Sequence, residues 1–205
     1  MTHIGHSEKV LVMRVFIAAL VLIFSVQSWT KADDINDFEI EGMSIGDSVL
    51  DFFTKYEIEN ALDTGGYKSD KFIYYFLEIK NSETYEYIQF HIKKNDKKYI
   101  IQAVEGHIMY LKDINKCYDK MNKVKLDLDK SFGFKGKRDK GKHPIDPTGK
   151  STYSRIMYEL QNQGYAEIIC YDLSQELENG GQYDRFVISL GTSEILDWLT
   201  NEAYN

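Results

Sequence analysis

The chain has 205 residues, with 25 Lys or Arg against 32 Asp or Glu, so its formal net charge at pH 7 is −7. That sign argues against general binding of nucleic acid, which requires a positively charged surface. A chain of this length with 43% hydrophobic residues can form one domain with a sizeable core.

The first 32 residues have the plan of a secretory signal peptide. An apolar run over residues 15 to 29 follows two basic residues and leads into Thr30-Lys31-Ala32, a small-x-small sequence that signal peptidase accepts. The run is shorter than the about 20 apolar residues that span a membrane, although an uncleaved anchor is the alternative. We expect cleavage after Ala32, with Met13 as an alternative start and no lipoprotein anchor, since no Cys lies near the cut.

Cleavage at this point would remove three basic residues and one acidic residue, a net of +2, and leave a mature chain with a charge of −9. We therefore expect a soluble periplasmic or secreted protein, a single domain over residues 33–205, with no nucleic-acid partner and no stable membrane insertion after processing.

A helix is predicted to begin at Ser44, because Ser44 and Asp47 have nearly the spacing of a capping box. Apolar residues at helical spacing would form its buried face: Ile45, Val49 and Phe52 or Phe53. Gly65-Gly66 would end this segment.

Three strands are predicted between Phe72 and Tyr110, where the pattern changes to period two in "FIYYFLEI", "TYEYIQFHI" and "YIIQAVEGHIMY". In the second strand one face would hold Ile88, Phe90 and Ile92, which indicates a meander with one buried face. Tyrosines on these strands fit the strand preference, with stacking on sugar rings as the alternative: Tyr74, Tyr75, Tyr85, Tyr87 and Tyr99.

A second helix is predicted from Asp113, as its cap, to Gly133, with apolar residues at helical spacing. Residues 134–150 then hold six Lys or Arg and both Pro, which predicts a long basic loop. Strand patterns return in "STYSRIMYEL", "YAEIICYDL" and "YDRFVISL", followed by a closing helix from Thr192 or Ser193 to Ala203.

The order helix-βββ-helix-βββ-helix predicts an α+β fold, in which an antiparallel meander sheet carries amphipathic helices packed on one face. The pairing of strands between the two halves stays open at this point.

Cys117 and Cys170 form an even pair in an exported chain, which indicates a structural disulfide. The chain-entropy model assigns such a bridge roughly 4 kcal/mol. Two separately buried thiols are the alternative, since the sequence does not set the distance between their α-carbons.

Gly46-Asp47-Ser48 resembles the nucleophile block of the GDS-type (SGNH) serine hydrolases, but the rest of that pattern is missing. No histidine among His91, His107 and His143 has Asp three positions earlier, and a serine without a base is a weak nucleophile. The start of a calcium loop at Asp127 lacks the required later residues. We expect no catalytic residues, no metal site and no cofactor.

The predicted basic loop carries a net charge of +4 and is the candidate site for an anionic partner, such as a phosphorylated glycan, a lipid headgroup or an acidic protein face. A solvated loop without a partner is the alternative. Its candidate residues are Lys135, Lys137, Arg138, Lys140, Lys142 and His143.

Nearly the whole mature chain resembles an uncharacterised family of small exported proteins from marine bacteria, through "FEIEGMSIGDSVLDFF", "INKCYDKMNKVKLDL" and "NEAYN". More remotely, "GMS" and the order of elements are similar to the β-lactamase inhibitor protein and outer-membrane assembly lipoprotein folds, which are protein-binding modules. The resemblance implies export and one compact domain, and it carries no catalytic or binding residues.

The leading hypothesis is an exported, non-catalytic module that binds a protein or envelope component. The alternatives are a small-ligand carrier with a pocket between sheet and helices and a GDS-type hydrolase that uses Ser48.

Overall fold

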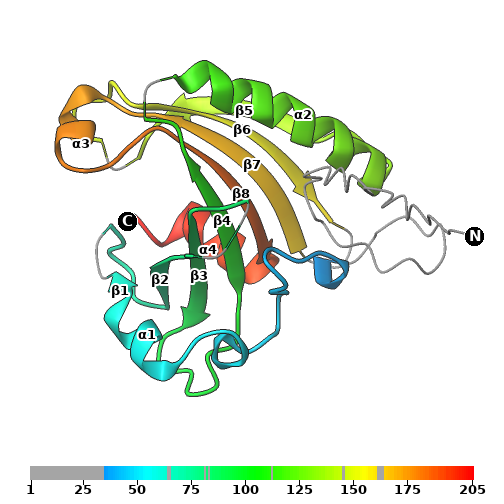
Figure 1. The fold of residues 1–205 in the computed structure, drawn as a ribbon, viewed down its shortest axis with the longest axis vertical. Coiled ribbons are helices and arrows are strands. Elements are labelled where there is room, and N and C mark those ends of the chain that lie inside the picture. Colours follow the sequence, from blue (N-terminus) through cyan, green and yellow to red (C-terminus); the bar gives the residue numbers. More distant parts are fainter. Residues whose placement is uncertain are drawn as a thin grey trace, which may run out of the picture.

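The computed structural model describes residues 35–63, 66–80, 82, 84–111, 113–144, 146–160 and 164–205. This part of the chain forms an eight-stranded antiparallel sheet with accompanying helices (Figure 1). The predicted α+β class with an antiparallel meander is therefore confirmed. The predicted signal peptide, residues 1 to 32, lies outside the described residues.

Two meanders join to make the sheet, in the strand order β1-β2-β3-β4-β8-β7-β6-β5. The strands are β1 Leu62–Asp63, β2 Phe72–Glu78, β3 Tyr87–Lys93, β4 Ala103–Met109, β5 Lys137–Lys142, β6 Thr152–Glu159, β7 Gly164–Asp172 and β8 Arg185–Thr192. The two halves meet where β4 pairs with β8, with Gly106 opposite Ile188. The last strand of the chain thus takes a central position, which suits its nearly continuous buried run.

The helices are α1 Lys55–Asn60, α2 Ile114–Phe132, α3 Gln175–Asn179 and α4 Ser193–Asn201. The predictions for α2 and α4 are confirmed. Asp113 caps α2 by accepting a hydrogen bond from the Asn115 backbone N–H at 3.1 Å. Gly133 ends this helix in the left-handed region, with φ 69°, where a residue without a side chain is favoured.

The predicted helix at Ser44 is wrong. Gly46 has φ +94°, which breaks any helix there, and residues 49–51 form only a 3-10 turn. The Asp47 carboxylate does accept from the Ser44 N–H at 2.8 Å, so the capping contact forms without a helix behind it. The true helix, α1, begins ten residues further along the chain, behind a capping box of Thr54 and Glu57.

The prediction of a loop throughout residues 134–150 is also wrong, because Lys137–Lys142 form β5 at the edge of the sheet. Cross-strand ion pairs join β5 to β6, from Lys137 to Glu159 at 3.0 Å and from Arg155 to Asp139 at 2.9 Å. A strand built from charged residues gives no apolar pattern in the sequence, yet it suits an edge position, where lysines oppose further strand addition.

The helices cover both faces of the sheet rather than the predicted one (Figure 1). On one face, here the α2 face, strand residues pack against α2; β7 contributes Ala166, Ile168 and Cys170 to it. On the other, here the α4 face, Ile195 and Trp198 of α4 pack against Phe72, Ala103 and Tyr165. On β7 the α4 face comprises Tyr165, Glu167, Ile169 and Tyr171, which alternate with the first set.

Cys117 of α2 and Cys170 of β7 lie at bonding distance on the α2 face, with their α-carbons 5.9 Å apart. This separation falls within the range of disulfides. The pair therefore joins the long helix directly to the sheet beneath it.

Candidate functional site

A cavity of about 460 Å³ lies on the α4 face, between α4 and the loop that joins β5 to β6. Most of its floor comes from strands β4, β6, β7 and β8, and Tyr74 of β2 and Gln89 of β3 also line it. Leu196, Leu199 and Thr200 of α4 form one wall, and Lys142, His143 and Pro144 line the opposite end. Concave sites between a sheet and a helix are where small ligands commonly bind.

Strand alternation places polar and charged side chains on this floor, since every second residue of a strand faces the same side. The strand register then sets them side by side, with Tyr171 opposite Arg185. The floor residues are Glu105 and His107 on β4, Tyr153 and Arg155 on β6, Glu167, Ile169 and Tyr171 on β7, and Arg185 on β8.

Glu105 lies at one end of the floor among three partners. Its carboxylate is 3.3 Å from His107 Nε2 and 4.0 Å from His91 Nδ1, and it accepts from Gln89 Nε2 at 3.3 Å. Burial acts to raise the pKa of Glu105, but the neighbouring His107, His91 and Arg185 outweigh it and lower that pKa. Burial lowers the pKa of both histidines. The Glu105 carboxylate is therefore ionised at neutral pH and lies within 4.0 Å of two buried histidines.

Glu167 lies at the same end of the floor as Glu105, since both are opposite Ser189 of β8, and Arg155 lies beside it. Arg155 Nη1 lies 3.8 Å from Glu167 Oε2, and Arg155 Nη2 donates to Asp139 Oδ2 at 2.9 Å. Within the described residues, neither Glu167 Oε2 nor Arg155 Nε has a hydrogen-bond partner. Burial raises the pKa of Glu167 to about 7, against the opposing effect of Arg155. This carboxyl group therefore changes charge near neutral pH.

Aromatic rings form the end of the cavity nearest α4. The Tyr67 hydroxyl lies 3.1 Å from His91 Nε2. Its ring contacts those of Tyr74, Trp198 and Tyr204 at centroid distances of 5.4, 4.9 and 5.3 Å. Because these contacts come from three separate segments, they hold Tyr67 in place and give a ligand a fixed apolar surface.

The opposite end of the cavity is basic. The Arg185 guanidinium lies over the ring of Tyr171, 4.8 Å from its centroid, and His143 contacts the same ring at 5.1 Å. Burial, with the nearby charge of Arg185, lowers the pKa of His143 to about 4. His143 is therefore a neutral polar group at neutral pH, and Lys142 is the exposed cation on the rim.

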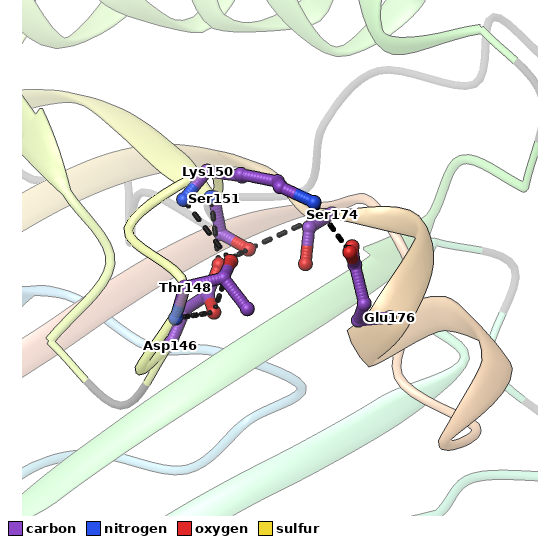
Figure 2. Close-up of polar contacts among 6 residues, drawn as sticks. All are labelled: Asp146, Thr148, Lys150, Ser151, Ser174 and Glu176. Atoms are coloured by element: carbon purple, nitrogen blue, oxygen red, sulfur yellow. Dashed lines mark hydrogen bonds and ion pairs between the residues drawn. The ribbon is translucent and has the colours of Figure 1, made fainter.

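Asp146 holds together the loop that carries this basic end (Figure 2). Its Oδ1 accepts from the backbone N–H and the hydroxyl of Thr148, at 2.8 and 2.7 Å. Its Oδ2 accepts from the backbone N–H and the hydroxyl of Ser151, at 2.8 and 2.5 Å. Four hydrogen bonds to one carboxylate fix the turn.

The same network connects the loop to α3 and to His143. The Ser151 hydroxyl accepts from the Ser174 N–H at 2.9 Å, and Lys150 forms an ion pair with Glu176 (Figure 2). The Ser151 carbonyl accepts from the His143 N–H at 2.9 Å. Asp146 therefore positions a residue of the cavity wall without contacting the cavity itself.

We predict that Asp146→Ala lowers the melting temperature and shifts the NMR signals of His143. Its hydrogen bonds hold the pKa of Asp146 well below the usual value, so their stabilisation is present above the unfolded pKa of about 3.9 and is lost as pH falls. The melting temperatures of wild type and variant should converge in acid. Asp119→Ala, an exposed change on α2, is the matched control; an equal effect of both changes would contradict the role of Asp146.

The six predicted residues for an anionic partner are divided by the structure. Lys142 and His143 line the cavity, whereas Arg138 and Lys140 line an open depression of about 640 Å³ on the surface. Lys137 pairs with Glu159, and Lys135 is exposed. Recognition of an anionic partner by the whole set stays a prediction.

Ser48 has a structural role in the described part of the chain. Its hydroxyl donates to the Lys98 carbonyl at 2.7 Å and accepts from the Leu50 N–H at 3.2 Å, and so caps the 3-10 turn. Asp47, its neighbour, is engaged with Ser44.

Four charged residues of the floor were missed by reasoning from the sequence: Glu105, Arg155, Glu167 and Arg185. The signal that would have found Glu167 is a single charge inside the apolar strand "YAEIIC". A charge at such a position must be buried on one face or open to a cavity.

Within the described ranges, no group of three or more His, Cys, Asp or Glu side chains is placed to hold a metal ion. None of the helices described is long and apolar enough to cross a membrane. No protein-family model, curated protein or solved structure matches the chain.

Proposed function

We propose that this protein is a non-catalytic carrier that binds a small polar ligand in the cavity between α4 and the β5–β6 loop. The observation that carries the proposal is the gathering of Glu105, Arg155, Glu167 and Arg185 on the cavity floor. A carrier of this kind needs a preformed cavity with a few converging polar groups, and no reactive nucleophile.

The free-energy cost of burying these charged side chains supports the proposal. Burying an ionisable group without full hydrogen bonding costs free energy, and a sheet face packed only for stability would be apolar. The α2 face shows that alternative, since β7 presents Ala166, Ile168 and Cys170 there. The difference between the two faces is the mark of a binding site, where perturbed ionisable groups collect.

We also propose that the protein acts in the periplasm or outside the cell. Cys117 and Cys170 at bonding distance support this location, because disulfides persist in oxidising compartments. The predicted leader over residues 1–32 supports it independently.

Native mass spectrometry of protein exported with its own leader tests the proposal. We expect a discrete mass that is present under native conditions and lost on denaturation. Leu199→Trp should reduce this mass, because Leu199 lines the cavity and a larger ring would fill it. Leu126→Trp is the matched control, since Leu126 is an exposed residue of α2 on the other side of the sheet.

A retained molecule whose occupancy is the same in wild type, Leu199→Trp and Leu126→Trp would contradict binding in this cavity. Turnover of the retained molecule, abolished by one change on the floor, would contradict a purely binding role.

A further inference from the structure

We infer that the ligand carries an anionic group, a carboxylate or a phosphate, that binds at Arg185 in the basic end of the cavity. This inference rests on the proposed function and names the chemistry of the molecule bound there.

Arg185 carries a positive charge that no acidic side chain in the described residues neutralises through an ion pair. Its guanidinium lies over Tyr171 and, among the described residues, donates one hydrogen bond, to the Tyr183 carbonyl at 3.4 Å. Asp184 comes next to it in the chain, but the Asp184 carboxylate accepts from the Leu173 N–H at 2.7 Å. A guanidinium has five N–H donors, so most of those of Arg185 are left for a ligand.

The contrast with Arg155 makes the assignment specific. Arg155 lies 2.9 Å from Asp139 and 3.8 Å from Glu167, so the protein itself supplies its counter-charges. The two arginines belong to the same floor, and only Arg185 lies beside other groups suited to an anion. A fork of guanidinium donors matches the oxygens of a carboxylate or phosphate in geometry and in charge.

The neighbours of Arg185 add to the attraction. His143 is buried, and its Nδ1 has no hydrogen-bond partner within the described residues. Lys142 at the rim forms no ion pair in that part of the chain and adds a second positive charge. A ligand anion would meet two cations and one neutral imidazole here.

The acidic end of the floor sets the direction of the ligand. Glu167 lies four residues from Tyr171 on β7, and Tyr171 is opposite Arg185 of β8. The α-carbon of Glu167 is therefore about 13 Å along the strands from the pair formed by Tyr171 and Arg185. Glu105 and Glu167 repel an anion. Glu167 Oε2 has no hydrogen-bond partner within the described residues and is suited to a hydroxyl or amine. The ligand therefore places its anionic group towards the β5–β6 loop and its donors towards α4.

The experiment uses the side-chain Nε–H signals of arginine in the ¹⁵N-labelled full chain. Sodium phosphate and sodium acetate are titrated separately at constant ionic strength, with methylammonium chloride as the cation control. We expect the Arg185 signal to shift saturably with an anion and not with methylammonium chloride. The anion that binds at the lower concentration shows whether the site prefers a phosphate or a carboxylate.

Arg185→Gln should weaken the binding of that anion by about 10- to 100-fold, the effect of losing a hydrogen bond to a charged group. Because this variant lacks the Arg185 signal, binding is compared through the backbone N–H signal of His143, which lines the same end of the cavity. Arg138→Gln, an exposed arginine outside the cavity, is the matched control and should leave the titration unchanged. Equal shifts at Arg185 and Arg138, or equal binding by both variants, would overturn the inference.

The native mass of the co-purifying molecule, measured in the variants, tests the anion site separately from the proposed cavity. A molecule whose native mass is lost in Leu199→Trp and kept in Arg185→Gln would leave the cavity as the binding site and refute the anion site. Loss of the mass in both variants, with retention in Arg138→Gln, is the expected result.

Discussion

Replacing Cys117 and Cys170 together with alanine is expected to lower the free energy of unfolding by about 4 kcal/mol. The bridge joins residues separated by 53 positions, so its loss frees a long segment of the unfolded chain. It also removes the covalent link between α2 and β7, which both contribute to the core of the α2 face. Urea denaturation under oxidising conditions measures the change.

Reductant provides the control for this prediction. Wild type with reductant should unfold at nearly the same urea concentration as the double variant, and the variant should not respond to reductant. Equal stability of wild type with and without reductant would show that the pair contributes nothing as a bridge.

Glu167→Gln is expected to make the protein more stable than wild type at pH 8. The pKa of Glu167 is raised from its model-compound value of 4.5 to about 7 in the folded protein, because the carboxyl is buried. Between these two pKa values the folded state holds a proton that the unfolded chain has released, so the free energy of unfolding falls as pH rises from about 4.5 to about 7. A shift of this size corresponds to about 3 kcal/mol, and glutamine has no charge to bury.

Urea denaturation at pH 5 and pH 8 measures this effect. Wild type should lose stability between the two values relative to Glu167→Gln. Glu159→Gln, a change at an exposed carboxylate on β6, is the matched control and should follow wild type. An identical change with pH in wild type and Glu167→Gln would contradict the raised pKa.

The two predictions treat the faces of the sheet differently. The disulfide on the α2 face serves stability, whereas Glu167 on the α4 face lowers stability at neutral pH. A destabilising group beside a cavity is a common feature of binding and active sites, where function requires a buried polar atom. We therefore expect Glu167→Gln to weaken ligand binding at the same pH at which it stabilises the fold.

Local signals account for most of the elements that were predicted correctly. α2 has apolar residues at helical spacing between a capping Asp113 and a terminal Gly133, and each signal acts within a few residues. The local predictions failed at Gly46, whose positive φ prevents a helix. They also failed at β5, whose charged residues lack the alternating apolar pattern by which a strand is recognised.

The sequence by itself determined the α+β class, three strands of each meander (β2 to β4 and β6 to β8), the two longest helices and the pairing expected of Cys117 and Cys170. Only the tertiary structure decided that β8 pairs with β4 and that α2 and α4 cover opposite faces. Those arrangements brought Glu105, Glu167 and Arg185 onto one floor from distant parts of the chain. Periodicity and caps act over a few residues, whereas strand partners and a shared cavity depend on how the whole core packs.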